Sequence, residues 1–192
     1  MKELDKILAL KSTPVTERYD GNPLQGLTSI VKVFAADGSP AFLTNSKLDL
    51  DTDSMADPTI RYESTHQNQT SIDPNGVWYN SNKLNGIVIP GGMSDRHAGT
   101  LGMGTLATVV YNGHVAHCVV FDVGPHAKFG EGSIALHRAL GFERVKNNRI
   151  IDVGIDRGVT TLIYIGSNIG KKPFIQADID KACAPLWAKF TS

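Results

Sequence analysis

Two acidic residues, Asp122 and Glu131, lie nine positions apart in the stretch DVGPHAKFGEGS, which covers residues 122–133. Asp122 ends a run rich in β-branched residues, and a Gly-Pro turn follows it closely. A strand end fixes the direction of a side chain, whereas the turn and Gly130 let the backbone return close to that strand. The two carboxyl groups are therefore candidates for a pair that faces one substrate.

A pair of carboxyl groups is what most enzymes use to hydrolyse a glycosidic bond. One carboxylic acid protonates the leaving oxygen, and the second carboxylate, across the sugar, activates water or attacks the anomeric carbon. Asp122 and Glu131 have the residue types for these roles. Acidic residues at strand ends and helix N-termini are also common for structural reasons, so a capping role for Glu131 is the alternative.

A second acidic stretch, KLDLDTDSMADP, covers residues 47–58. The two-residue period of a strand places Lys47, Asp49, Asp51 and Asp53 on one face and the leucines on the other. Like charges at this spacing repel, so they are expected to be solvated, to bind cations or to line a cleft for a positively charged ligand. A calcium loop is the rival interpretation, but serine replaces its turn glycine and isoleucine its bidentate glutamate.

The histidines raise the question of a zinc site. His114 and His117 are three positions apart in a predicted strand, so they point to opposite faces and cannot chelate one ion together. No serine nucleophile elbow, phosphate-binding loop or dinucleotide fingerprint occurs in the sequence. We therefore predict no metal site and no cofactor.

The elements that must position these residues are mainly β-strands. Short runs rich in Val, Ile and Tyr, divided by Gly, Asn, Asp and Pro, predict strands at residues 29–35, 86–90 and 160–166. They belong to a predicted β-core over residues 29–166. No internal repeat or linker divides the chain, so residues 1–192 are expected to form one domain.

The clearest strand signal is a hairpin within TLATVVYNGHVAHCVVF. Asn112 and Gly113 have the residue types of a type I′ turn between two strands. A two-residue turn pairs Tyr111 with His114, and alternation from there places Asp122 at the end of one face of the second strand. The hairpin is therefore expected to carry the first carboxyl group of the pair.

Three helices are predicted around these strands. The first is an N-terminal helix over residues 1–13, and the second is a short helix that follows Gly130 and ends at Gly141. The third covers residues 177–190 and contains Pro185. Its apolar stripe is formed by Ile179, Cys183, Leu186, Trp187 and Phe190.

Composition restricts the partners and the compartment. The 19 basic and 19 acidic side chains cancel, and no Lys/Arg stripe occurs, so nucleic acid is not an expected partner. No apolar run reaches membrane-spanning length, so no membrane is expected as a partner. The expected oligomeric state is a monomer. Only two cysteines occur, and Cys118 in an apolar strand is predicted to be a buried free thiol. The first residues do not have the pattern of a signal peptide.

Three segments together resemble the chitosanases of glycoside hydrolase family 75. DVGPHAKFGEGSIALHRALG resembles the family signature, in which a D-x-G-P turn is followed by G-E-x-S and a short helix. KLDLDTD resembles the family's K-[LM]-D-[IL]-D strand, and QNQTSIDPNGVWYNSNKLNGIVIPGG resembles the run from Q-T-S to an apolar strand that ends in proline. The similarity covers roughly residues 42–165 in family order.

The resemblance implies an endo-acting, metal-independent hydrolase of chitosan, a β-1,4-linked glucosamine polymer, with inversion at the anomeric carbon. The family's essential Asp and Glu fall on Asp122 and Glu131. Its β-core is similar to a six-stranded double-psi barrel with an open groove. The substrate would place the enzyme outside the cell. We add the expectation that Asp49, Asp51 and Asp53, together with Lys47, contact the substrate, because carboxylates favour the ammonium groups of chitosan.

Two departures and two alternatives accompany this interpretation. Members of the family are generally secreted, whereas no export signal is recognised in this sequence, which leaves the localisation open. LGMGTLATVVY lacks the Gly-Asp pair expected before that strand, which leaves details of the cleft open. The first alternative is a related barrel that cleaves peptidoglycan or another cell-wall glycan and uses Asp122 alone. The second is a non-catalytic carbohydrate-binding module, for which an exposed aromatic row is expected, whereas Trp78 and Tyr79 are adjacent rather than alternating.

Overall fold

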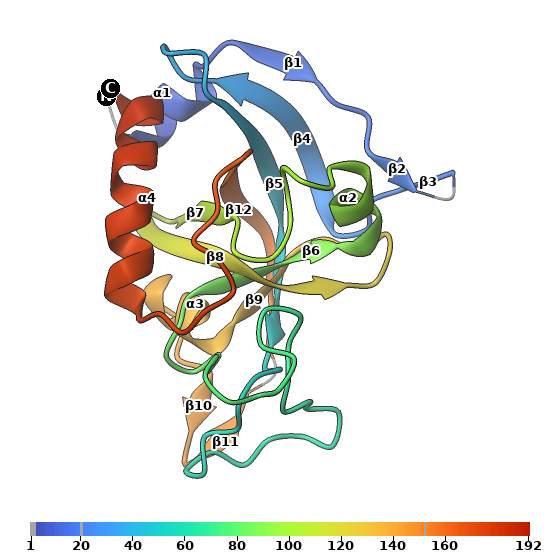
Figure 1. The fold of residues 1–192 in the computed structure, drawn as a ribbon, viewed down its shortest axis with the longest axis vertical. Coiled ribbons are helices and arrows are strands. Elements are labelled where there is room, and N and C mark those ends of the chain that lie inside the picture. Colours follow the sequence, from blue (N-terminus) through green and yellow to red (C-terminus); the bar gives the residue numbers. More distant parts are fainter. Residues whose placement is uncertain (1–2, 20, 152) are drawn as a thin grey trace.

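The computed structural model describes residues 3–19, 21–151 and 153–192 and is mainly β, with a closed six-stranded barrel and a few short helices (Figure 1). Around the barrel the strands follow the order β5, β12, β7, β8, β6, β9, and β9 pairs with β5 to close it. The barrel strands are β5 (Pro40–Asp51), β6 (Gly86–Pro90), β7 (Leu106–Tyr111), β8 (His114–Gly124), β9 (Glu131–Ser133) and β12 (Ile155–Tyr164).

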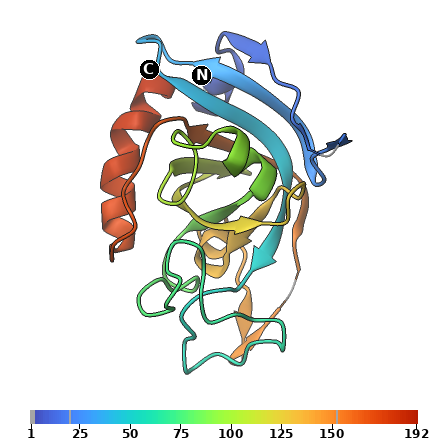
Figure 2. The same cartoon turned by 45° about the vertical axis from the view of Figure 1, so that its right-hand side comes forward.

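The remaining elements surround the barrel. The outer β4 follows the long, curved β5, as Figure 2 shows, and β1 pairs with β4. These elements are α1 (Glu3–Leu8), β1 (Ser12–Pro14), β2 (Arg18–Tyr19), β3 (Asn22–Pro23), β4 (Leu27–Phe34), α2 (Gly91–Arg96), α3 (Ile134–Ala139), β10 (Val145–Lys146), β11 (Arg149–Ile150) and α4 (Gln176–Thr191). The predicted mainly β class, with a six-stranded barrel and peripheral helices, is confirmed.

The predicted hairpin is present as β7 and β8. Tyr111 pairs with His114, and the register continues to Leu106 opposite Val119. Asn112 and Gly113 have φ angles of 48° and 84°, as the two central positions of a type I′ turn require. The local sequence therefore fixes both the turn and the pairing of the strand that carries the first candidate carboxylate.

The N-terminal helix is shorter than predicted. Helix α1 ends at Leu8, and Ser12–Pro14 forms β1 instead, because pairing with β4 gives this segment backbone partners that a helix interrupted by proline lacks. Residues 1–2 of the predicted helix lie outside the described residues. The C-terminal helix is confirmed as α4, which includes Pro185.

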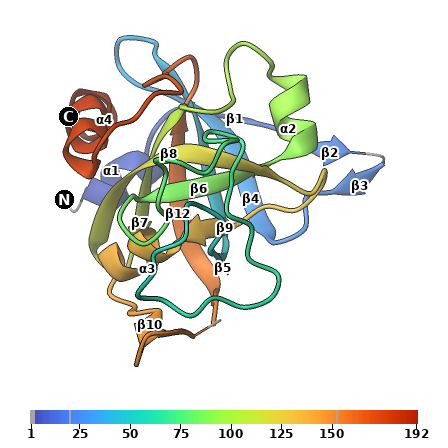
Figure 3. The same ribbon diagram turned by 60° about the horizontal axis from the view of Figure 1, so that its bottom comes forward.

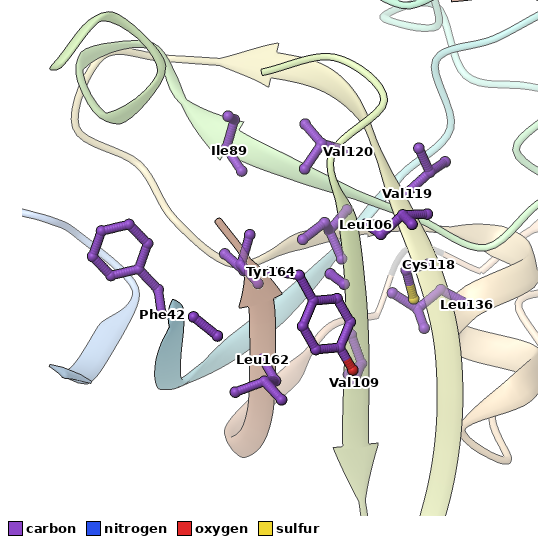
Figure 4. Packing of buried hydrophobic residues seen from close by; sticks show 14 of the residues in the cluster. Phe42, Ile89, Leu106, Val109, Cys118, Val119, Val120, Leu136, Leu162 and Tyr164 are labelled. Carbon is purple, nitrogen blue, oxygen red and sulfur yellow. The ribbon is translucent and has the colours of Figure 1, made fainter. Parts of the chain in front are cut away.

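Apolar side chains from the barrel strands pack together with Leu136 of α3 (Figure 4). Residues of α4 belong to the same core. The predicted stripe of α4 is buried at Ile179, Cys183, Trp187 and Phe190. Cys118 is a buried free thiol, as predicted. None of the helices in the described part of the chain is long and apolar enough to cross a membrane.

The short helix after Gly130 begins later than Glu131. Ser133 is its N-cap residue and accepts a hydrogen bond from the Leu136 backbone N–H, whereas Glu131 lies in β9. Gly141, beyond the helix C-terminus, has a φ of 93° and ends the helix, as predicted. The alternative in which Glu131 caps this helix is therefore wrong.

Between β5 and β6, residues 52–85 form a long segment without helices or named strands. In Figure 3 this segment runs across the strands of the barrel. The Ile72 N–H donates to the Phe121 carbonyl (3.0 Å), which attaches the segment to β8 one residue before Asp122. The segment thus reaches the strand end that carries the first carboxylate.

Candidate active site

Asp122 and Glu131 lie on either side of one residue of the central strand β6. Val88 pairs with Asp122 of β8 on one side and with Glu131 of β9 on the other. Residues paired across strands present their side chains on the same face of the sheet. Two strand spacings of about 4.8 Å place the two Cα atoms about 10 Å apart. The barrel thus brings the predicted pair together on one face.

The side chain of Glu131 extends across β6 toward β8. A Cβ atom added to Gly124 would lie 3.1 Å from Glu131 Oε2 and 3.0 Å from Val88 Cγ1. Gly124 is two residues beyond Asp122 on the same strand. The Glu131 carboxylate therefore lies so close to Gly124 that a methyl group there would crowd it by a few tenths of an ångström.

We predict that Gly124→Ala lowers the kcat of a reaction that depends on Glu131 by roughly 2- to 10-fold, because the carboxylate must move by a few tenths of an ångström in a positioned site. KM and the thermal transition should change little. Steady-state kinetics and a melting curve check this. The matched control is Gly102→Ala, since a Cβ atom at Gly102 meets no atom within 4 Å. An unchanged kcat for Gly124→Ala would contradict the assigned position of Glu131.

Asp122 is held through one of its two carboxyl oxygens. Oδ1 accepts hydrogen bonds from the Ser71 N–H (2.9 Å), the Ser71 hydroxyl and the Val123 N–H (2.8 Å). These are the hydrogen bonds that the carboxyl group makes within the described residues, and Oδ2 takes part in none of them. The side chain is thereby fixed, and Oδ2 is the oxygen that can carry a proton to a ligand.

Glu131 has a different environment, because it is paired with a lysine. Lys128 Nζ lies 2.6 Å from Glu131 Oε1 and 3.5 Å from Asp49 Oδ2. Partial burial tends to lower the pKa of Lys128, but the hydrogen bond to Glu131 and the charge of Asp49 outweigh it, so the pKa is raised. Lys128 is therefore a cation that forms an ion pair with Glu131.

The loop between the two carboxylates is fastened at several points. The backbone carbonyl of Gln25 accepts a hydrogen bond from the Phe129 N–H (2.9 Å), and the Gln25 N–H donates one to the Ala127 carbonyl (2.8 Å). Gly130 has a φ of 88°, and a Cβ atom there would lie 2.4 Å from the Lys47 carbonyl oxygen. Glycine is thus required where the chain returns to β5. The loop therefore holds Glu131 at a fixed position relative to Asp122.

The second acidic stretch does not form one solvated face. Lys47 forms an ion pair with Asp49, next to Lys128. Strand β5 ends at Asp51, so Asp53 lies beyond the predicted strand and accepts a hydrogen bond from the Gln67 N–H (2.8 Å). The expected strand face therefore holds for Lys47, Asp49 and Asp51 and is wrong for Asp53, because the chain turns into the 52–85 segment.

Asp51 and Asp53 lie close enough to the pair for their charges to interact with it. Burial raises the pKa of Asp51 to about 8, and the charges of Asp53, Asp122 and Glu131 raise it further against the opposing effect of the Asp53 N–H. Burial is also the main cause that raises the pKa of Asp53. Asp51 is therefore a neutral carboxylic acid at mildly acidic pH.

Stability should depend on pH through Asp51. Its pKa is about 8 in the folded chain against 3.8 ordinarily. The contribution of Asp51 to the free energy of unfolding is therefore fully present below about pH 4, and it is lost as the pH rises toward 8. We expect Asp51→Asn to flatten this decline in the free energy of unfolding, measured with urea between pH 4 and pH 9. Asp156→Asn, at an exposed position, is the control. Parallel curves for wild type and Asp51→Asn would contradict the raised pKa.

His114 and His117 of β8 have separate surroundings. His114 is exposed at the hairpin, and His117 is hydrogen-bonded to Thr108 (2.9 Å). Within the described ranges, no group of three or more His, Cys, Asp or Glu side chains is arranged to hold a metal ion.

Sequence reasoning missed three residues of the site: Ser71, Gly124 and Lys128. Each lies inside one of the segments that resemble family 75. The sequence contains no signal that Ser71 contacts a carboxylate 51 positions away. Comparison of the chain with models of known protein families and with curated proteins finds no match.

Proposed function

We propose that this protein hydrolyses β-1,4-glucosamine linkages within chitosan, with inversion at the anomeric carbon. The observation that carries the proposal is the pairing of Val88 with both Asp122 and Glu131. Inverting glycosidases keep their two carboxyl groups about 6.5 to 9.5 Å apart, which leaves room for a water molecule. Two strand spacings, shortened by the reach of Glu131 toward β8, agree with that range.

Asp122 acts as the acid and Glu131 as the base. Asp122 transfers the proton on Oδ2 to the glycosidic oxygen as the bond from that oxygen to the anomeric carbon breaks. Glu131, which is oriented by its ion pair with Lys128, removes a proton from a water molecule whose oxygen bonds to the anomeric carbon from the opposite face. Proton exchange with solvent then restores both groups.

Chitosan is preferred to neutral chitin because acidic side chains surround the pair. Asp53 lies near both carboxylates, and Asp49 and Lys47 lie beside Lys128. We infer a modest preference, because Asp49 is neutralised by lysines and Asp51 holds a proton over most of the relevant pH range. We also propose that the closed barrel has the double-psi connectivity of the family that the motifs resemble.

The test is the release of reducing ends from chitosan, chitin and peptidoglycan assayed side by side. We expect cleavage of chitosan, and NMR of the first product should show the α-anomer, because inversion of a β-linkage gives that configuration. A β-anomer as the first product would contradict inversion. Cleavage of peptidoglycan alone would favour the alternative glycan-cleaving barrel, and binding without cleavage would favour a carbohydrate-binding module.

A further inference from the structure

A hydrophilic cavity adjoins Asp122 and belongs to neither acidic stretch. It has a volume of about 330 Å³ and is formed by the 67–74 segment together with Asp122 and Val123. Glu131 and Lys128 do not line it. Its size falls within the range of about 300 to 1,000 Å³ that is typical of small-molecule sites. The cavity thus extends the site on the side of Asp122.

The chemistry of the cavity suits a neutral polyol. Its polar lining residues are Gln67, Gln69, Thr70, Ser71 and Asp122. The Ser71 hydroxyl donates to Asp122, and the Thr70 hydroxyl accepts from the Asp73 N–H (3.2 Å). The side chains of Gln67 and Gln69 make no hydrogen bonds to other described residues. Each amide therefore offers two N–H donors and a carbonyl acceptor to a ligand, and this combination matches the hydroxyl and acetamido groups of a sugar.

The segment that carries these amides is fixed relative to the acid. Besides Ser71 and Ile72, which bind β8, Asp73 accepts hydrogen bonds from the Trp78 N–H (2.7 Å) and the Tyr79 N–H (2.9 Å). Gly76, with a φ of 63°, packs so closely on Asn68 that a Cβ atom would lie 1.9 Å from the Asn68 carbonyl oxygen. A preorganised segment loses little entropy when a ligand binds.

The lining of the cavity carries few charged groups. Asp122 is the one acidic residue among the cavity-lining residues, and Asp53 lies next to the lining as the acceptor of the Gln67 N–H. Lys47, Asp49 and Lys128 form their ion-pair network around Glu131. The amides of the lining offer hydrogen-bonding partners to an acetamido group, so binding at this position does not depend on an ammonium group.

We propose that the cavity formed by residues 67–74 beside Asp122 binds one sugar unit, N-acetylglucosamine as well as glucosamine, on the leaving-group side of the scissile bond. The assignment to that side rests on the proposed function, because a general acid contacts the leaving oxygen. The enzyme then requires no ammonium group at this position, and it cleaves partially acetylated chitosan.

The test combines binding with product analysis. Tetramers of glucosamine and of N-acetylglucosamine are titrated calorimetrically into Glu131→Gln, alone and combined with Gln69→Ala. Gln69→Ala should weaken binding of the acetylated tetramer about tenfold, which corresponds to the loss of one or two hydrogen bonds. Thr65→Ala is the matched control, because Thr65 is exposed on the same segment outside the cavity lining.

In active enzyme that carries Gln69→Ala, fewer new non-reducing ends of products from partially acetylated chitosan should be N-acetylglucosamine. Equal affinities with and without Gln69→Ala, or no binding of the acetylated tetramer, would overturn the subsite. These outcomes are separable from the function. Binding through Gln69 without chitosan cleavage would leave the subsite intact and reject the hydrolase, and cleavage with no effect of Gln69→Ala would do the reverse.

Discussion

Asp122→Asn is expected to lower the rate of chitosan cleavage by about 10²- to 10⁴-fold, the contribution of a general acid. Asparagine retains an oxygen that can accept from the Ser71 and Val123 N–H groups, so the loop attachment should remain. The thermal transition is therefore expected near that of the wild type. Reducing-end assays and calorimetry measure the two quantities.

A substrate that needs no acid gives a sharper test of this role. In a chito-oligosaccharide that carries a dinitrophenyl group, this leaving group departs without protonation. Asp122→Asn should therefore keep most of its activity on this activated substrate. Asp156→Asn, at an exposed position in β12, should behave as wild type on both substrates. An equal loss on chitosan and on the activated substrate would reject the acid role, and loss of folding would indicate a structural role.

Glu131→Ala is expected to lower the cleavage rate by about as much as Asp122→Asn lowers it on chitosan. The loss should be the same on chitosan and on the activated substrate, because no base remains to activate water. Azide needs no deprotonation and fits the space that the carboxylate leaves. Added azide should therefore restore turnover and yield a glycosyl azide of inverted configuration, detectable by NMR. Azide should not rescue Asp122→Asn on chitosan.

The control for this experiment is Glu63→Ala, an exposed glutamate on the 52–85 segment, which should retain wild-type rates. Chitosan cleavage by Glu131→Ala at the wild-type rate would reject the base role. That result would favour the alternative in which the same barrel cleaves a glycan with Asp122 alone.

The position of Lys128 gives the two carboxyl groups unequal environments. A lysine three residues before Glu131 is visible in the sequence, but its ion pair depends on the turn around Gly130 and on the β5–β9 pairing. Asp122 instead receives neutral donors from a distant segment. Two carboxyl groups in different environments are the usual basis for separate acid and base functions.

The sequence by itself determined the local elements that carry the site. Asn112 and Gly113 specify the hairpin, since their residue types accept positive φ angles, and alternation within β8 follows from that register. The apolar spacing of α4 and the glycine at the end of α3 act through neighbours a few positions apart. Such features need no knowledge of distant contacts.

The tertiary structure alone decided how the chemistry is arranged. Pairing of Val88 with two strands, attachment of Ser71 to Asp122 and burial of Asp51 all join residues far apart in the sequence. The prediction that Asp53 shares a strand face failed because β5 ends at Asp51, and the helix predicted over residues 1–13 stopped early because β1 pairs with β4. Hydrogen bonding between strands and loss of hydration depend on the closed barrel, which no local pattern specifies.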